Sequence, residues 1–253
     1  MPAPLLRTLA VCDLVDSTAL TEQLGDRGAA ELMHKLDRLT RDLLYAHSGR
    51  EIDKTDGFLV MFERPIQAVA FALAYQRLLR AEQEKEHVPL QARIGIHVGD
   101  VVLWENSMDD VSRGAKAVEV EGLVKPVASR LMGLALPGQI LLSAVVYTFA
   151  QRAQRELGLE YPSPEWREHG RYLFKGVAEP MTVYEVGEQG IAPLTARTTA
   201  ARRIVKCRGG GVLVWSRWKS PRSRRRSWSP HICRCAARGR SRSQTAIGSS
   251  SAI

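Results

Sequence analysis

The sequence has few cysteines, no long apolar run and, in residues 197–253, no acidic residue. Its four cysteines are Cys12 and, far downstream, Cys207, Cys233 and Cys235. A single apolar-flanked cysteine in residues 1–196 indicates a reducing compartment rather than a disulfide framework. No stretch approaches the roughly 20 apolar residues that span a membrane. The apolar stretch near the start is short and interrupted by charges, so no secretory signal is readable. We therefore expect a soluble, cytoplasmic protein.

Charge divides the chain into two parts. Residues 1–196 carry 21 lysines and arginines against 27 acidic residues, a balance of −6, whereas residues 197–253 carry 15 basic residues, a balance of +15. Together they give the formal net charge of +9, so the basic character belongs to the tail. We expect one folded domain over residues 1–188. Residues 189–253 form an Arg/Ser-rich tail that cannot bury a core and is expected to be disordered.

Three interpretations of the tail stay open. Arginines interspersed with Trp215, Trp218 and Trp228 would bind nucleic acid non-specifically, through phosphate contacts and base stacking. An abrupt change to Arg, Ser, Cys and Trp without acids is also typical of a frameshifted GC-rich reading frame, and an undifferentiated linker is the third interpretation. His231 and the nearby cysteines lack the paired spacing of a zinc site.

Hydrophobic periodicity predicts alternating strands and helices in the body. Expected strands cover residues 6–15, 93–99, 101–104, 140–142, 172–174 and 182–186, with a hairpin through Asp56-Gly57 that runs to Phe62. Expected helices cover residues 16–25, 26–48, 65–86, 124–136 and 144–157, the last capped by Ser143. Gly99-Asp100 is expected to turn, and residues 105–114 and 158–169 to form loops. This order favours an α/β sandwich, an open antiparallel-rich sheet with helices on one face.

Two aspartates stand beside β-type residues. Asp13 follows the apolar run Leu-Ala-Val-Cys, and a carboxylate at the end of a buried strand is costly unless it is paired or holds a metal. Asp56 precedes Gly57 between two apolar runs, which is a hairpin signal. Side by side in one sheet, the two would form an oxygen-lined site suited to Mg²⁺ or Mn²⁺. Structural alternatives are a helix cap for Asp13 and a simple turn for Asp56.

Five sequence blocks, in order within residues 6–186, carry a resemblance. They read DLVDSTALTEQLGD, GREIDKTDGFLVMFE, RIGIHVGDV, EGLVKPVASRLMGLALPGQILLS and GRYLFKGVAEPMTVYEV. Together they resemble the catalytic domain of class III adenylate/guanylate cyclases. The resemblance implies a ferredoxin-like fold, with an antiparallel-rich sheet and helices packed on it. It also implies conversion of ATP to 3′,5′-cyclic AMP and pyrophosphate in intracellular signalling.

The resemblance assigns the metal and phosphate positions. Asp13 and Asp56 match the two aspartates that hold two divalent metals, Mg²⁺ or Mn²⁺, in this family. One metal activates the ribose 3′-hydroxyl for attack on the α-phosphorus, and the other anchors the triphosphate. The backbone at Ser17 and Thr18, where a helix begins after Asp13, would offer N–H groups to phosphate oxygens.

Other functional positions are implied on the partner subunit of a head-to-tail homodimer. Arg130 matches the arginine that neutralises charge on the phosphoryl oxygens, a role that suits a planar guanidinium. Lys175 resembles the phosphate-contacting lysine. From spacing alone, Arg130 reads as an exposed helix arginine and Lys175 as a solvated hairpin lysine.

Three departures from the family pattern bear on activity and base specificity. Pro126 stands where the family has a ribose-orienting asparagine, and proline offers no donor. The hairpin is one residue shorter than in the family. Because a one-residue slip reverses the face of a strand side chain, either Lys54 or Asp53 takes the base-reading position, but not both. Glu119 aligns with the second base-reading position.

The two base-reading arrangements predict different substrates. Lys54 with Glu119 favours ATP, which is also the commoner substrate of the family. Asp53 with Glu119 would offer two acceptors, better matched to the donors of guanine and hence to GTP. Two functions follow: a nucleotidyl cyclase, or a non-catalytic cyclase-like module that binds nucleotide or a partner, which Pro126 favours.

Overall fold

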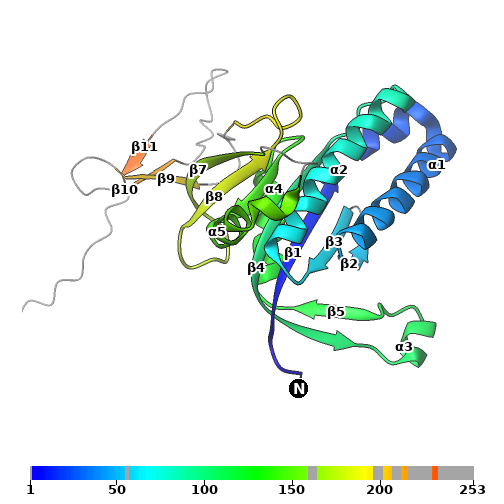
Figure 1. Cartoon of the computed structure of the whole chain (residues 1–253), viewed down its shortest axis with the longest axis horizontal. Helices are drawn as coiled ribbons and strands as arrows, with labels where there is room; N and C mark the ends of the chain where they lie inside the picture. Colours follow the sequence, from blue (N-terminus) through cyan, green and yellow to red (C-terminus); the bar gives the residue numbers. More distant parts are fainter. Residues whose placement is uncertain are drawn as a thin grey trace, which may run out of the picture.

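The central strand β1 (Leu5–Leu14) organises the sheet of the protein (Figure 1). This computed structural model describes residues 2–54, 57–158 and 164–195, with the backbone of three short segments beyond them. Strand β1 pairs antiparallel with β3 (Gly57–Phe62) on one side and β4 (Ala92–Glu105) on the other. The prediction of a strand at residues 6–15 is confirmed.

The remaining elements alternate as expected along the chain. The other strands of the body are β2 (Arg50–Lys54), β5 (Val118–Glu121), β6 (Ile140–Ser143), β7 (Glu165–Leu173) and β8 (Met181–Gly187). The helices are α1 (Ser17–Ala46), α2 (Pro65–Glu86), α3 (Met108–Ser112), α4 (Val124–Leu134) and α5 (Ala144–Arg152), with a 3-10 turn at Gln154–Leu157. The order β7-β8-β6-β4-β1-β3-β2 contains one parallel pair, β4 with β6. The expected mixed fold with an antiparallel-rich sheet is confirmed.

Helices cover both faces of the sheet, so the expectation of helices on one face is wrong in this detail. Side chains alternate along β1: Ala10 and Cys12 join the core under α1, α2 and α5, whereas Leu9 joins the opposite cluster with Ala128 of α4. Gly95 of β4 allows α4 to pack close to the backbone of the sheet. A Cβ at Gly95 would lie 2.2 Å from the Met132 nitrogen, so only glycine fits beneath the helix backbone.

Strand β4 runs unbroken through Gly99-Asp100, where a turn was expected. Residues 102–105 pair with β5, so the backbone hydrogen bonds continue beyond the sheet as a two-stranded arm (Figure 1). A Cβ at Gly99 would lie 3.0 Å from the Val124 side chain, so this glycine serves close packing against α4. The expected loop at 105–114 contains the short helix α3.

Three local expectations can be compared with the structure. The two helices expected at 16–25 and from 26 are one element, α1, with a kink at Gly25 (φ 72°, ψ 163°). Ser143 precedes α5 but makes no capping hydrogen bond, because its hydroxyl pairs with His97 Nδ1 at 2.8 Å. Strand β7 begins at Glu165, inside the segment expected to be a loop.

The tail contributes three short strands to the same sheet. Strand β9 (Arg202–Lys206) pairs with β7, followed outward by β10 (Val212–Trp215) and β11 (Pro230–Ile232). The expected disorder of residues 189–253 concerns, for the most part, positions outside the described residues, and the boundary at 188 stays a prediction. Within the described ranges, no helix is long and apolar enough to cross a membrane.

Candidate active site

Asp13 lies at the end of β1, between two neighbouring strands. Its register partners are Gly57 of β3 and Arg93 of β4. Arg93 Nη2 donates to Asp13 Oδ2, and no described residue donates to Asp13 Oδ1. The carboxylate lines a cavity of about 400 Å³ that lies between the strand ends and α4. Asp13 is therefore held by one cation and still faces open space.

Gly57 brings β3 against the backbone of β1. A Cβ at this position would lie 2.0 Å from the carbonyl oxygen of Cys12, so no other residue fits there without movement of the strands. The glycine of the Asp-Gly pair thus serves a close approach between strands. Asp56 precedes Gly57 in the chain, and both Thr55 and Asp56 lie outside the described residues.

A β-bulge decides which hairpin residue faces this cavity. The pairing of β2 with β3 skips one residue between Glu51 and Asp53, so that Ile52 and Asp53 both turn toward the α4 face. Lys54 turns to the other face, where its ammonium pairs with Asp37 of α1. The Lys54 Nζ also lies 5.8 Å from the ring centroid of Phe58. Of the two alternatives for the base-reading position, the bulge places Asp53 at the cavity and Lys54 away from it.

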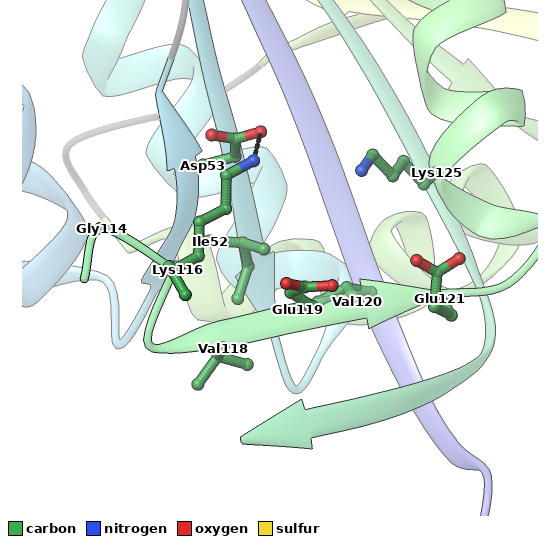
Figure 2. A pocket seen from close by; sticks show the side chains of 10 residues that line it. Ile52, Asp53, Gly114, Lys116, Val118, Glu119, Val120, Glu121 and Lys125 are labelled. Atoms are coloured by element: carbon green, nitrogen blue, oxygen red, sulfur yellow. Dashed lines mark hydrogen bonds and ion pairs between the residues drawn. The ribbon is translucent and has the colours of Figure 1, made fainter. Parts of the chain in front are cut away.

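A second cavity of about 330 Å³ adjoins the first and is also lined by Asp53. Lys116, from the loop before β5, donates to Asp53 Oδ2. Figure 2 shows Lys116 reaching toward Asp53, while Lys125 extends from the start of α4. Glu119 of β5 lines the same cavity and accepts a hydrogen bond from Asn106 Nδ2 at 3.1 Å. Acidic and basic side chains therefore line the two adjoining cavities from Asp13 to Glu119.

Helix α4 contributes side chains to both cavities. Lys125 lines both of them and makes no ion pair with any residue in the described ranges. Pro126 lies in the first turn of α4, where a missing N–H removes no helical hydrogen bond. Proline is thus compatible with the helix here, although it leaves the position without a donor.

The remaining predicted site residues lie elsewhere on the surface. Arg130 of α4 and Lys175, between β7 and β8, are exposed and line neither of these two cavities. Ser17 and Thr18 are exposed at the start of α1, whose N-cap Asp16 has φ 54° and makes no side-chain capping bond. Within one chain, Asp53 shares the larger cavity with Asp13 and the smaller one with Glu119. Arg130 and Lys175 line neither of the two.

The donors available at this site are oxygens and amines. Burial raises the pKa of the Cys12 thiol, so this residue brings no thiolate to the cavity at pH 7. The Cys12 side chain packs in the core on the face of β1 opposite α4. Burial lowers the pKa of His97 to about 4, so this histidine is neutral at pH 7. The hydrogen bond between His97 Nδ1 and the Ser143 hydroxyl indicates a structural role for this histidine.

Comparisons with known proteins identify the architecture. The adenylyl cyclase CyaB from P. aeruginosa superposes with a TM-score of 0.63 at 20% identity, over 75% of this chain and 97% of that one. The guanylyl cyclase Cya2 gives a TM-score of 0.61 at 22% identity, over 77% and 99%. The chain has the fold of class III adenylyl/guanylyl cyclase catalytic domains. The fold expected from the resemblance is confirmed.

Sequence comparison also finds distant relatives of this chain. An adenylate cyclase of Glutamicibacter nicotianae is 27% identical over 146 residues, which is 57% of this chain and 32% of that protein. The chain spans about half the length of the first curated relatives it matches. No family model matches the chain. The similar proteins include both adenylyl and guanylyl cyclases, so the comparisons do not single out one nucleotide.

The metal site implied by the cyclase fold can be tested against the residues present. Within the described ranges, no group of three or more His, Cys, Asp or Glu side chains converges. Mg²⁺ is nevertheless commonly bound by one or two carboxylates together with substrate phosphates rather than by an all-protein cage. Asp13, with one oxygen free of described donors and an open cavity before it, fits such a site.

Three residues beside the two cavities were not expected from the sequence. Arg93 could have been found from the antiparallel register, since it lies directly opposite Asp13. Lys125 precedes Pro126 in a block that was already recognised. No sequence pattern pointed to Lys116, because it reaches the cavity from a loop that lies outside the predicted strands.

Proposed function

We propose that this protein is a nucleotidyl cyclase that converts ATP to 3′,5′-cyclic AMP and pyrophosphate by metal-assisted catalysis at a site shared between two copies. One observation carries the proposal. Asp13 faces an open cavity at a strand end, directly opposite Gly57, whose preceding residue is Asp56. The fold of class III cyclases supports the same conclusion.

The reaction exchanges one phosphorus–oxygen bond for another. The ribose 3′-oxygen attacks the α-phosphorus, the bond from that phosphorus to the oxygen that bridges to the β-phosphate breaks, and pyrophosphate leaves with the electron pair. The 3′-hydroxyl proton passes to solvent. Divalent cations held by Asp13 and Asp56 would lower the pKa of the 3′-hydroxyl and neutralise charge on the phosphates. Arg93 keeps the Asp13 carboxylate in one orientation through its hydrogen bond to Oδ2.

A second copy of the chain completes the proposed site. Arg130 and Lys175 line neither cavity of their own chain, so their guanidinium and ammonium groups are available to a triphosphate bound mainly by a partner. Two-fold pairing of identical chains then gives two equivalent sites. In each of them, Arg130 stabilises charge on the phosphoryl oxygens as the pyrophosphate leaves.

Lys125 is proposed to compensate for Pro126. The family position occupied by Pro126 offers no side-chain donor. The ammonium of Lys125, one residue earlier on α4, lines both cavities and has no described ion-pair partner. It can donate to the ribose or to a phosphate oxygen without any rearrangement of the helix.

Pro126 also supports a second candidate, a cyclase-like module that binds nucleotide without turnover. Incubation of the full-length chain with Mn²⁺ and either ATP or GTP, followed by quantification of products, separates the two functions. The proposed enzyme forms cyclic nucleotide and pyrophosphate in equal amounts, with more product from ATP. Nucleotide binding without either product, in both Mn²⁺ and Mg²⁺, contradicts the enzyme and supports the module.

A further inference from the structure

The base-reading lysine expected from the hairpin is not in the cavity. Lys54 pairs with Asp37 on α1 and lies over Phe58, on the face of the sheet away from α4. To reach the cavity, Lys54 would have to reverse the β-bulge that turns Asp53 inward. Side chains on opposite faces of a strand cannot exchange without a register shift. A cationic side chain in this cavity must therefore come from a residue other than Lys54.

Lys116 is the cation that meets Asp53. Its ammonium donates to Asp53 Oδ2 inside the smaller cavity, which Glu119 also lines (Figure 2). The pair is partly screened from solvent, since the exposed fraction of the side chain is 20% for Asp53 and 48% for Lys116. A donor and an acceptor therefore stand side by side at the wall of a cavity of about 330 Å³.

Asn106 holds this arrangement in place. Its Nδ2 donates to the backbone oxygen of Lys116 at 2.8 Å and to Glu119 Oε1 at 3.1 Å. The Asn106 backbone nitrogen also donates to the oxygen of Ala117 at 3.1 Å. One asparagine thus ties the loop that carries Lys116 to the carboxylate of Glu119.

We propose that Lys116 is the residue that makes this site select adenine, with its ammonium next to the Asp53 carboxylate. Adenine presents on its Watson–Crick edge a ring nitrogen that accepts a hydrogen bond beside an amino group that donates one. Lys116 and Asp53 offer the complementary donor and acceptor. Guanine presents on that edge two adjacent donors, N1–H and N2–H, beside the acceptor O6, and the two donors match two carboxylates rather than a carboxylate beside an ammonium. Without Lys116, the cavity would keep Asp53 and Glu119 as acceptors and would favour guanine.

This inference rests on the proposed function for the identity of the site, but its test does not depend on turnover. ATP labelled on the ribose with an N-methylanthraniloyl group is bound to the full-length protein in Mn²⁺, and unlabelled ATP and GTP displace it. The ratio of their dissociation constants measures base preference. The ratio of kcat/KM for the two triphosphates is measured in parallel.

Replacement of Lys116 with methionine removes the donor and keeps most of the side-chain volume. We expect Lys116→Met to shift the ATP-over-GTP ratio toward GTP by at least about tenfold, the scale of one lost polar contact. Lys116→Arg should restore most of the preference. Asn106→Ala should lower the preference in the same direction as Lys116→Met, because it releases the loop.

Lys54→Met is the matched control, because this lysine lies on the opposite face of the same strand as Asp53. We expect it to leave the ratio within about twofold of wild type. Thermal unfolding of each variant verifies that the fold persists. A preference that moves with Lys54→Met but not with Lys116→Met overturns the proposal, as does wild-type protein that binds neither triphosphate. Binding with the expected ratios but without product upholds Lys116 and refutes only the proposed enzyme.

Discussion

Asp13 of β1 and Arg93 of β4 lie opposite each other in the antiparallel register and form an ion pair at the edge of the larger cavity. The Arg93 Nε is buried without a hydrogen-bond partner among the described residues. Arg93 therefore depends on Asp13 for much of its electrostatic compensation. The residue proposed to hold metal is at the same time part of the strand-to-strand packing.

A double-mutant cycle on this pair is the first prediction. Asp13→Asn and Arg93→Gln should each lower the free energy of unfolding by about 1–2 kcal/mol, since each leaves a partly buried partner uncompensated. The double variant should be less destabilised than the sum of the two, as measured by urea unfolding. The exposed pair Arg27–Glu31 on α1 is the control, with an expected coupling below about 0.5 kcal/mol. Strict additivity for Asp13 and Arg93 contradicts the inferred dependence.

Packing of α4 on the sheet gives the second prediction. Gly95→Ala would place a Cβ 2.2 Å from the Met132 nitrogen and 2.3 Å from the Ala128 oxygen, so α4 must shift. We expect a loss of at least about 2 kcal/mol in unfolding free energy, typical of overpacking. Gly133→Ala, with nothing within 4 Å of its Cβ, should stabilise α4 by up to about 1 kcal/mol. Chemical denaturation compares the two, and equal effects would show that the close contact under Gly95 carries no energetic cost.

The pH dependence of stability gives the third prediction. Burial lowers the pKa of His97 to about 4, whereas an unfolded histidine titrates near 6.5. Above that range neither state is charged at this position, and stability is unaffected. As the pH falls from about 6.5 to 4, the unfolded chain binds a proton that the folded chain does not. Up to about 3 kcal/mol of stability is lost as a result.

Substitution of His97 tests this directly. In the His97→Gln variant, the decline in unfolding free energy between pH 6.5 and pH 4 should be smaller than in wild type. His34→Gln, at an exposed histidine of α1, serves as the control and should keep the wild-type profile. Parallel curves for wild type and His97→Gln would mean that His97 is not kept neutral by burial.

Mixing of two inactive variants tests the shared site. Asp13→Asn removes a metal ligand from one chain, and Arg130→Ala removes the phosphate contact that the other chain is proposed to supply. In a freely exchanging mixture, half of the dimers are mixed and each keeps one intact site. We therefore expect recovery to roughly a quarter of wild-type activity. Asp13→Asn mixed with Asp56→Asn should recover nothing, because both changes affect the same half-site. Equal recovery in the two mixtures contradicts the assignment of Arg130 to the partner.

Most of the fold was predictable from the sequence because its signals are local. The periodicity of apolar residues located β1, α2, α4 and β6 within a few residues, and the kink of α1 coincides with the expected boundary between two helices. The unbroken course of β4 was not predictable. Gly99 looks like a turn residue in sequence, and its actual reason, the approach of Val124, appears only in three dimensions.

The site was predictable in its residue types but not in its register. Asp13 was identified from its position after an apolar run, and it lines the cavity. The sequence could not show whether Asp53 or Lys54 faces the cavity, because this depends on a β-bulge that has no recognisable sequence pattern here. Lys116 was missed for a related reason, since its contact with Asp53 joins residues 63 positions apart.

Asp13 and Asp56 are proposed to hold divalent cations together, at the strand ends that Gly57 brings into contact. The most direct test is the rate of cyclic nucleotide formation from ATP across a Mn²⁺ titration, for wild type, Asp13→Asn, Asp56→Asn and the double variant. We predict that each single variant loses at least about 100-fold and that the double variant is little worse than either, because the two carboxylates act as one unit. Wild-type activity in either single variant would contradict the claim.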